Sequence, residues 1–461
     1  MLQSSAFALL GLVLGCQPVV HLGRGGERER NRVSPILEQA TILVLLAGGL
    51  ELAQFITGRA PRLIDFVMNS AAVLIGLLIA AVQQILDGQF SRALFVFRPS
   101  GRASSAGKSR RRTTSSTGPR VERVPLSGDA FPYASRSIFI LGAPRSGTTW
   151  LAKVLDSHPA VLYRHEPDII HRNPTIPFLC EAEDASRLAP IAKRWLTELT
   201  HCRVLKSAGS LPVFYKSYHT RLQTLLRILL ICLLKGLAVI PGCRRWAEAI
   251  RIPDFSDLDV DCVGRIVIKS VSCMGRVNVL ARAAADSRFI LIIRHPCGQV
   301  SSMLRGVRAG KFEDRIPILT LAETPQARRR GLTMEKLRDL PFVAQLAWSW
   351  VIENEMALEA LDAEAVQKMI VRYFDLAVDP EGMARRMLAF CGLEVEEQVI
   401  DFIRESSRAD GTEGYYELRR VPRDAAQRWR KDLSPDEIDT IMQIVGQSRP
   451  GRLFADAIIG A

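Results

Sequence analysis

Residues 137–151 read SIFILGAPRSGTTWL, and this stretch decides the fold. The apolar run at 137–142 is typical of a buried strand, and the turn after it holds Gly142 and Gly147. Two glycines let the backbone curl until several N–H groups converge on one point. A helix that begins near Gly147 adds the positive end of its dipole. The stretch therefore predicts a strand, an anion-binding turn and a helix.

The side chains of this turn indicate which phosphate compound it suits. Thr148 and Thr149 supply hydroxyl donors, and Arg145 supplies a permanent positive charge. The spacing is close to the nucleotide-binding pattern G-x-x-x-x-G-K-[ST], but Thr148 occupies the position of the lysine. The sequence therefore lacks the central residue of a P-loop kinase or NTPase, which would use ATP with Mg²⁺. Such an enzyme stays open as an alternative.

Two further apolar runs, at 263–268 and 289–293, also predict buried strands. Because amphipathic stretches separate them, we expect an α/β fold with a parallel sheet. Lys269 follows the first run and Arg294 follows the second, and Ser302 comes eight residues after Arg294. An arginine at a strand end can form two parallel hydrogen bonds to a phosphate. The sequence thus predicts a second anion site.

The two predicted anion sites together resemble those of the sulfotransferase superfamily that uses 3′-phosphoadenosine 5′-phosphosulfate (PAPS). Residues 144–151 are similar to the first signature of that superfamily, and the R-x7-S spacing after a strand is similar to the second. His-Glu-Pro at 165–167 resembles the glycan and tyrosylprotein branch. The resemblance covers about residues 136–435. It implies an α/β sulfotransferase domain at 136–461, with a P-loop-like nucleotide site flanked by helices.

The resemblance also implies which residues bind PAPS. An arginine-rich stretch at 419–423 resembles the loop that closes over the nucleotide, and Ser301 is the neighbouring alternative to Ser302. Trp150 belongs to the first signature, although it is most simply explained as a core residue. The implied donor-binding residues are Arg145, Ser146, Gly147, Thr148, Thr149, Trp150, Arg294, Ser302 and Arg423.

The implied reaction is in-line transfer of a sulfuryl group from PAPS to an acceptor hydroxyl, with no metal required. Arg145 and Lys269 are the residues expected to stabilise charge that develops on the bridging and leaving oxygens. Glu166 is the predicted general base, and its alternative role would be to orient His165 or Arg164. His158 and His165 are the rivals for the base, and His158 is better explained as structural.

Residues 1–90 predict a membrane-associated helical segment. Residues 66–86 hold no charge, and 21 residues are about enough to span a bilayer as a helix. Residues 36–86 resemble part of VanZ-like membrane proteins through Glu51, Gln54, Gly58, Arg59, Asp65 and Asn69, and we expect an anchoring role for them. The linker at 91–135 is basic and rich in Ser and Gly. Positive charge next to a membrane segment predicts that the catalytic domain faces the cytoplasm.

Composition excludes several classes of protein. The net charge is +13, but residues 98–123 hold eight Lys/Arg and one acid, so a nucleic-acid-binding domain is not expected. With 48% hydrophobic residues the chain is not disordered as a whole. The nine cysteines form no CxxC pair and no zinc spacing, so we expect neither a disulfide scaffold nor a structural metal.

The acceptor is less defined than the donor. Membrane attachment and the Glu166 pattern favour a glycan, a glycolipid or another lipid-linked hydroxyl, while a phenol, a peptide tyrosine or a small natural product stays open. A non-catalytic protein that binds nucleotide at a membrane is a further alternative. The apolar stretch 222–241 contains Arg227 and Lys235, so a buried helix or an interfacial helix is expected there rather than a membrane span. The sequence does not indicate the oligomeric state.

Overall fold

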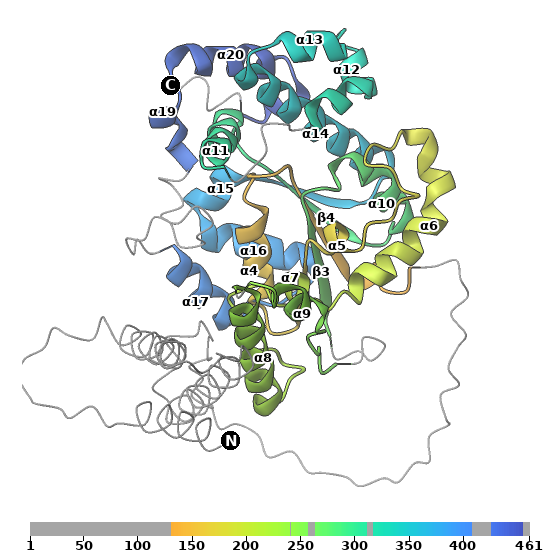
Figure 1. The fold of residues 1–461 in the computed structure, drawn as a ribbon, viewed down its shortest axis with the longest axis vertical. Helices are drawn as coiled ribbons and strands as arrows, with labels where there is room; N and C mark the ends of the chain where they lie inside the picture. The colour runs from red at the N-terminus through yellow and green to blue at the C-terminus, as the bar shows by residue number, and fades with distance from the viewer. Residues whose placement is uncertain (1–130, 240, 257–262, 311–316, 408–425, 455–461) are drawn as a thin grey trace, which may run out of the picture. The chain divides into compact units, whose positions relative to one another are not determined.

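A five-stranded parallel sheet lies at the centre of the part of the chain that the structure describes (Figure 1). The structure, a computed structural model, describes residues 131–239, 241–256, 263–310, 317–407 and 426–454. The predictions for residues 1–90 and for the linker up to residue 130 lie outside these ranges. The strands stand in the order β2-β3-β1-β4-β5. Their bounds are β1 Ser137–Leu141, β2 Val161–His165, β3 Arg265–Ser270, β4 Arg288–Ile293 and β5 Gln367–Arg372.

The three strands predicted from sequence are confirmed as β1, β3 and β4. All of β1 is buried, and β4 is buried after its first residue. Parallel strands covered on both faces are apolar throughout, which is why these three could be read from sequence. Phe139 of β1 pairs with Phe289 of β4, and their rings stack with centroids 5.0 Å apart.

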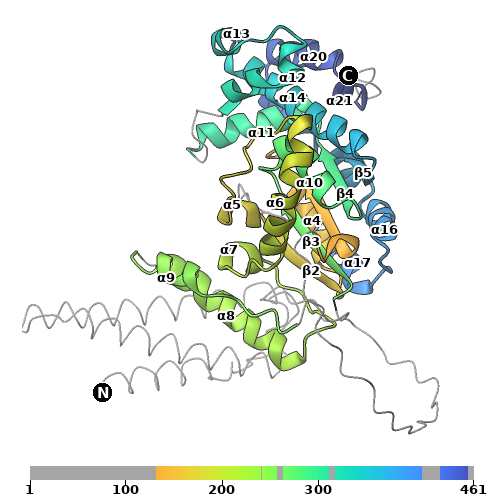
Figure 2. The same ribbon diagram turned by 90° about the vertical axis from the view of Figure 1, so that its right-hand side faces the viewer.

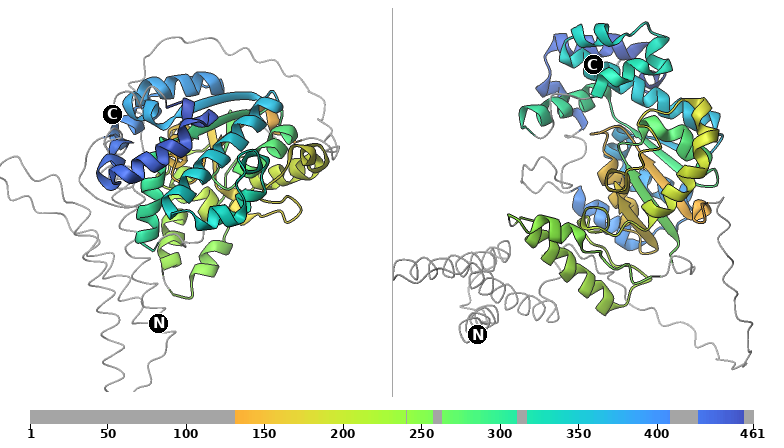
Figure 3. Two further views of the ribbon diagram at one scale, coloured as in Figure 1. Left: turned by 90° about the horizontal axis from the view of Figure 1, so that it is seen from above. Right: turned by 45° about the vertical axis from the view of Figure 1, so that its right-hand side comes forward.

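Helices cover both faces of the sheet (Figures 2 and 3). The α-helices are α4 Thr148–Asp156, α5 Pro167–Ile170, α6 Ala182–Thr200, α7 Leu205–Ala208, α8 Arg221–Val239, α9 Arg244–Ala249, α10 Val277–Ala283, α11 Pro296–Arg308, α12 Pro325–Arg328, α13 Met334–Asp339, α14 Phe342–Ala363, α15 Tyr373–Val378, α16 Pro380–Cys391, α17 Glu397–Ser406, α19 Trp429–Asp432, α20 Pro435–Gly446 and α21 Arg449–Arg452. Short 3₁₀ turns are η1 Ala134–Arg136, η2 Met274–Arg276 and η3 Pro317–Glu323.

The strand order places a topological switch at β1. The chain leaves β1 through α4 toward β2 on one side, and leaves β3 through α10 toward β4 on the other. Right-handed crossovers in opposite directions put α4 and α10 on opposite faces of the sheet. Ligands of open α/β sheets bind beyond the carboxyl ends of the strands at such a point. The glycine turn that follows β1 lies there.

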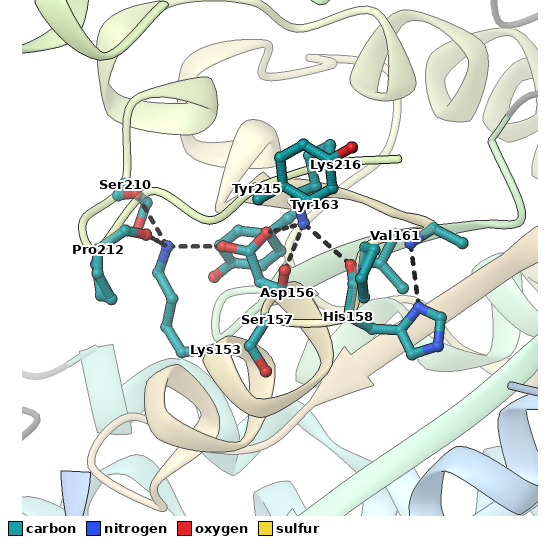
Figure 4. A network of polar contacts seen from close by, with 12 residues as sticks. Lys153, Asp156, Ser157, His158, Val161, Tyr163, Ser210, Pro212, Tyr215 and Lys216 are labelled. Atoms are coloured by element: carbon teal, nitrogen blue, oxygen red, sulfur yellow. Dashed lines mark hydrogen bonds and ion pairs between the residues drawn. The ribbon is translucent and has the colours of Figure 1, made fainter. Parts of the chain in front are cut away.

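A buried ion cluster anchors the carboxyl-terminal half of α4 (Figure 4). Lys153 Nζ pairs with Asp156 at 2.7 Å and donates to the carbonyl oxygens of Ser210 and Pro212, each at 2.9 Å. Lys216 Nζ pairs with the other carboxylate oxygen of Asp156 at 2.9 Å. The charged side chains of these three residues are largely removed from solvent. The cluster therefore ties the segment at 210–216 to the helix that begins at the glycine turn.

Helix α8 packs against the domain with one face only. Thr224, Ile228, Ile231 and Leu234 are buried, and Arg227 donates to the carbonyl oxygen of Ala208 at 2.9 Å. The opposite face exposes large apolar side chains, including Leu222, Leu226 and Leu233. Among the described residues, α8 is the one helix that is long and apolar enough to cross a membrane. The structure thus shows a half-buried helix where the sequence left a buried or an interfacial helix open.

Candidate functional site

The turn after β1 has the geometry of an anion site. Arg145 and Gly147 both have left-handed backbone, with φ angles of 71° and 101°. Ser146 N donates to the carbonyl oxygen of Ala143 at 3.1 Å, which closes the turn. Helix α4 begins at Thr148, and no side chain in the described part of the chain caps its first amides. Uncapped amides at a helix N-terminus bind anions. The turn and the helix start that the sequence predicts are both present.

Close packing explains why this turn has glycine at two positions. A Cβ atom on Gly147 would lie 2.4 Å from Cδ2 of Tyr373, and one on Gly142 would lie 2.7 Å from the carbonyl oxygen of Ile292. Ile292 belongs to β4, and Tyr373 comes directly after β5. The turn is therefore held against the ends of two other strands.

The second predicted anion site lies beside the first. Arg294 follows β4 and donates from Nη1 to the carbonyl oxygen of Arg145 at 3.2 Å, although 149 residues separate them. Arg145 donates from Nε to Oγ of Ser302, on α11, at 3.0 Å. The structure thus brings Arg145, Arg294 and Ser302 together at the carboxyl edge of the sheet.

Two aromatic residues fix the position of Arg294. Its guanidinium lies over the ring of Tyr373, with Cζ 4.8 Å from the ring centroid. Trp350, on α14, donates from its indole nitrogen to the carbonyl oxygen of Arg294 at 3.0 Å. The ring of Tyr373 thus contacts both predicted anion sites, a role that the sequence analysis did not assign to it. A tyrosine directly after a strand was the available signal.

Ser301 and Ser302 have different environments. Ser301 donates to Asp432 at 2.9 Å and accepts a hydrogen bond from Arg305 at 3.0 Å, so it belongs to a neighbouring polar cluster. Ser302 is fully buried and meets Arg145. Of the two serines, Ser302 is therefore the one that contacts the predicted anion-binding residue Arg145.

Lys269 and Glu166 form an ion pair at the ends of β3 and β2. The backbone N–H of Glu166 donates to the carbonyl oxygen of Lys269 at 2.8 Å, and Lys269 Nζ contacts Glu166 Oε1. Burial lowers the pKa of Lys269, although Glu166 acts in the opposite direction. Burial alone would raise the pKa of Glu166, but the charge and hydrogen bond of Lys269, together with weaker charge effects of neighbouring residues, outweigh burial and lower the pKa. The lowered pKa of Glu166 favours its carboxylate form beside the Lys269 side chain.

The two histidines that rival Glu166 are neutral. His158 interacts through Nε2 with the carbonyl oxygen of Glu394 at 3.1 Å and accepts from the amide of Ala160 at 3.1 Å. His165 interacts with the hydroxyl of Tyr163 at 2.8 Å. Burial lowers the pKa of His158 to about 4 and that of His165 to about 3. These contacts give His158 a structural role.

The remaining predicted residues are placed as follows. Trp150 is buried, and its indole nitrogen donates to Ser406 of α17 at 3.1 Å. Ser146 and Thr148 are buried in the turn, Thr149 is partly exposed, and Arg423 lies outside the described residues. Among the described residues, no group of His, Cys, Asp and Glu could hold a metal ion, and the seven described cysteines are free thiols.

Known proteins match the part of the chain that contains this site. The sequence model described as "Sulfotransferase family" matches residues 137–397. The Danio rerio protein "Carbohydrate sulfotransferase 1" is 24% identical over 353 residues, which are 69% of this chain and 79% of that protein.

Two solved structures align with this chain at low sequence identity. The sulfotransferase domain from the Synechococcus PCC 7002 olefin synthase is 20% identical, with a TM-score of 0.34, and the match covers 66% of this chain and 93% of that one. Mouse sulfotransferase SULT7A1, complexed with PAP, is 14% identical, with a TM-score of 0.33, and the match covers 71% of this chain and 90% of that one.

Proposed function

The chain belongs to the sulfotransferase family, and we propose that this enzyme transfers a sulfuryl group from PAPS to a hydroxyl group of a glycan. The observation that carries the proposal is the hydrogen bond between Arg294 and Arg145, because it joins two anion sites into one binding region. A donor with phosphate at both ends of its ribose needs two such sites, whereas ATP needs one. The similarity to a carbohydrate sulfotransferase supports a glycan as the acceptor.

The residues of the turn fit the 5′ end of PAPS. Ser146 is 1% exposed, and its Oγ has no hydrogen-bond partner among the described residues. This Oγ lies inside the turn, because a Cβ on Gly142 would be 2.6 Å from it. An oxyanion held by the turn would accept a hydrogen bond from this hydroxyl, which satisfies a buried polar group. We place the 5′-phosphosulfate on Ser146, Gly147, Thr148 and Thr149.

The second site fits the 3′-phosphate. Arg294 is 9% exposed, and the aromatic contacts described above hold it in one orientation. A planar guanidinium that is already positioned loses little freedom when it binds a phosphate. Ser302 supplies a hydroxyl next to it. We place the 3′-phosphate on Arg294 and Ser302, with Arg423 as a further contact from the loop that closes over the nucleotide.

Three residues carry the proposed chemistry. Bound PAPS supplies the sulfuryl group and the leaving phosphate. Arg145 and Lys269 stabilise the negative charge that develops on the oxygens around that group, and removal of one such donor typically costs about 10²–10³ in rate. Glu166 accepts the proton of the acceptor hydroxyl, and a general base contributes roughly 10²–10⁴-fold. Lys269 keeps Glu166 ionised until the acceptor arrives.

We further propose that the enzyme acts at a membrane. Residues 1–90 would anchor it, and the basic linker would keep the catalytic domain on the cytoplasmic side. The exposed leucines of α8, together with Trp246 at 77% exposure, support contact with a lipid surface. Protease treatment of sealed membrane vesicles tests the orientation, because a cytoplasmic domain is digested in inside-out vesicles and protected in right-side-out ones.

The direct test of the proposed function uses full-length protein in detergent with ³⁵S-labelled PAPS. The acceptors are p-nitrophenyl glycosides of galactose, N-acetylglucosamine and glucose, with p-nitrophenol and a tyrosine peptide for comparison. Label on a glycoside supports the proposal. Transfer from γ-³²P-labelled ATP with Mg²⁺, and none from PAPS, would replace it with a kinase.

A further inference from the structure

A partly open pocket lies between α11 and α14, beside the turn after β1 that we propose holds the donor. Pro144, the residue directly before Arg145, forms part of its wall. Helix α11 carries Ser302, and α14 carries the Trp350 that bonds to Arg294, so both walls also belong to the donor site. A molecule in this pocket would therefore lie next to the residues proposed to hold the sulfuryl group.

Helical spacing directs polar side chains into this pocket. Gln299 and Met303 are four residues apart on α11, and Ser349 and Glu353 are four apart on α14. Residues with this spacing share one face of a helix. Helix α11 therefore presents one polar and one apolar side chain to this space, and α14 presents two polar side chains.

Gln299 is an unexplained polar group in the pocket wall. It is 7% exposed, and its Oε1 has no hydrogen-bond partner among the described residues. Buried side-chain oxygens are nearly always hydrogen-bonded, so an exception requires an explanation. A ligand that donates a hydrogen bond to Oε1 provides one.

Glu353 is a second hydrogen-bond acceptor in the same wall. Its Oε1 accepts a hydrogen bond from the Ser349 hydroxyl at 2.8 Å. No Lys, Arg or His is among the described residues that line the pocket, and Glu353 is the one titratable group there. Burial raises the pKa of Glu353 to about 7. An anionic ligand is therefore disfavoured, and a ligand with neutral hydroxyl donors is favoured.

We propose that this pocket is the acceptor subsite, in which Gln299 and Glu353 accept hydrogen bonds from two hydroxyls of an uncharged sugar ring. The proposal rests on the proposed function and names the acceptor class that this chain selects. Met303, Leu346 and the edge of Trp350 supply an apolar wall for the less polar face of the ring. The hydroxyl that reacts would point past Pro144 toward Arg145 and Lys269.

Steady-state kinetics of the full-length enzyme test the subsite. The variants are Glu353→Gln and Gln299→Met, which keep side-chain volume, and the probe is the p-nitrophenyl glycoside that the wild type sulfates fastest. Each variant should raise KM for the glycoside roughly 10- to 100-fold, because a hydrogen bond of the substrate is lost. The affinity for PAP, measured by calorimetry, should stay unchanged, which also shows that the variants are folded.

Glu359→Gln is the matched control. Glu359 is on the same helix, but it pairs with Arg329 at the surface, so KM should stay at the wild-type value. An unchanged KM in both pocket variants would overturn the subsite. A wild type that sulfates p-nitrophenol or the tyrosine peptide and no glycoside would overturn it as well, while leaving transfer from PAPS intact. Failure of the wild type to use PAPS at all would remove both proposals.

A second measurement does not depend on the folding of those variants. In Met303→Cys, alkylation at position 303 is followed by peptide mass spectrometry, which separates it from the native cysteines. The glycoside should slow this alkylation in a saturable way. Equal alkylation rates with and without saturating glycoside would show that the sugar does not occupy the pocket.

Discussion

The guanidinium of Arg294 donates a hydrogen bond to the carbonyl oxygen of Arg145 at 3.2 Å. One residue follows β4 and the other lies in the turn after β1, and these strands are neighbours in the sheet. The protein therefore fixes the positions of the two predicted anion-binding segments relative to one another before any donor binds. Such preorganisation lowers the entropy cost of binding the donor.

The steric fit of the turn predicts the effect of Gly147→Ala. The added Cβ would meet Tyr373 at 2.4 Å, and alanine disfavours the left-handed backbone at this position. We expect PAP affinity to fall at least about 10-fold, since the turn must open to relieve the contact. Gly446→Ala serves as control, because nothing lies within 4 Å of its Cβ position. Equal PAP affinity of the two variants in calorimetry would show that the turn does not bind the donor.

Replacement of Glu166 by glutamine tests the proposed base. The amide keeps the size of the side chain but cannot accept a proton, so kcat should fall by roughly 10²–10⁴. PAP binding should persist, because Glu166 is not placed at either anion site. Rapid-quench measurement of sulfate transfer separates this effect from product release. Near-normal turnover would remove Glu166 from the role of base.

The raised pKa of Glu353 predicts a pH dependence of acceptor binding. The carboxylate is the better hydrogen-bond acceptor, and its pKa is about 7. KM for the glycoside should therefore rise as pH falls through about 7, and it should be lowest when the group is ionised. The Glu353→Gln variant should lose this dependence. A wild-type KM that is flat across the same range would exclude an ionised Glu353 from acceptor binding.

The buried cluster on α4 predicts a large loss of stability in Asp156→Asn. The substitution leaves Lys153 and Lys216 buried without a counter-charge, and breaking a buried pair typically costs about 3–5 kcal/mol. The lysines lower the pKa of Asp156 even though burial opposes this, so the stabilisation is present above the ordinary carboxyl pKa. It should be lost as pH falls through the lowered value. Urea unfolding at neutral pH measures the difference, and a change below about 1 kcal/mol would mean that the lysines are neutral.

The strands that are apolar throughout could be predicted from the sequence, whereas β2 could not. Arg164 interrupts β2, yet it is fully buried because it pairs with Asp254, a contact that no local pattern reveals. Strand β5 reads QKMIVR and lies at the edge of the sheet, so its polar residues are partly exposed. Both strands exist because tertiary contacts outweigh local composition.

The site residues that could be predicted from the sequence are those that come shortly after a strand. Arg145, Lys269 and Arg294 stand at the ends of apolar runs, so parallel topology brings them to one edge. Tyr373 follows the edge strand β5, and Glu353 lies within a long helix of mixed pattern. Their places depend on how helices pack around the sheet, and this packing has no local signature in the sequence.

Calorimetry of nucleotide binding tests the two joined anion sites most directly. Full-length wild type and Arg294→Lys are titrated with PAP, which has a 3′-phosphate, and with AMP, which lacks it. Arg282→Lys, a surface arginine that pairs with Glu364, serves as control. We predict that the wild type and the control bind PAP at least about 10-fold more tightly than AMP, and that Arg294→Lys loses most of this preference while its affinity for AMP is unchanged. Equal binding of PAP and AMP by the wild type would show that the residues at 145 and 294 do not hold the two ends of one donor.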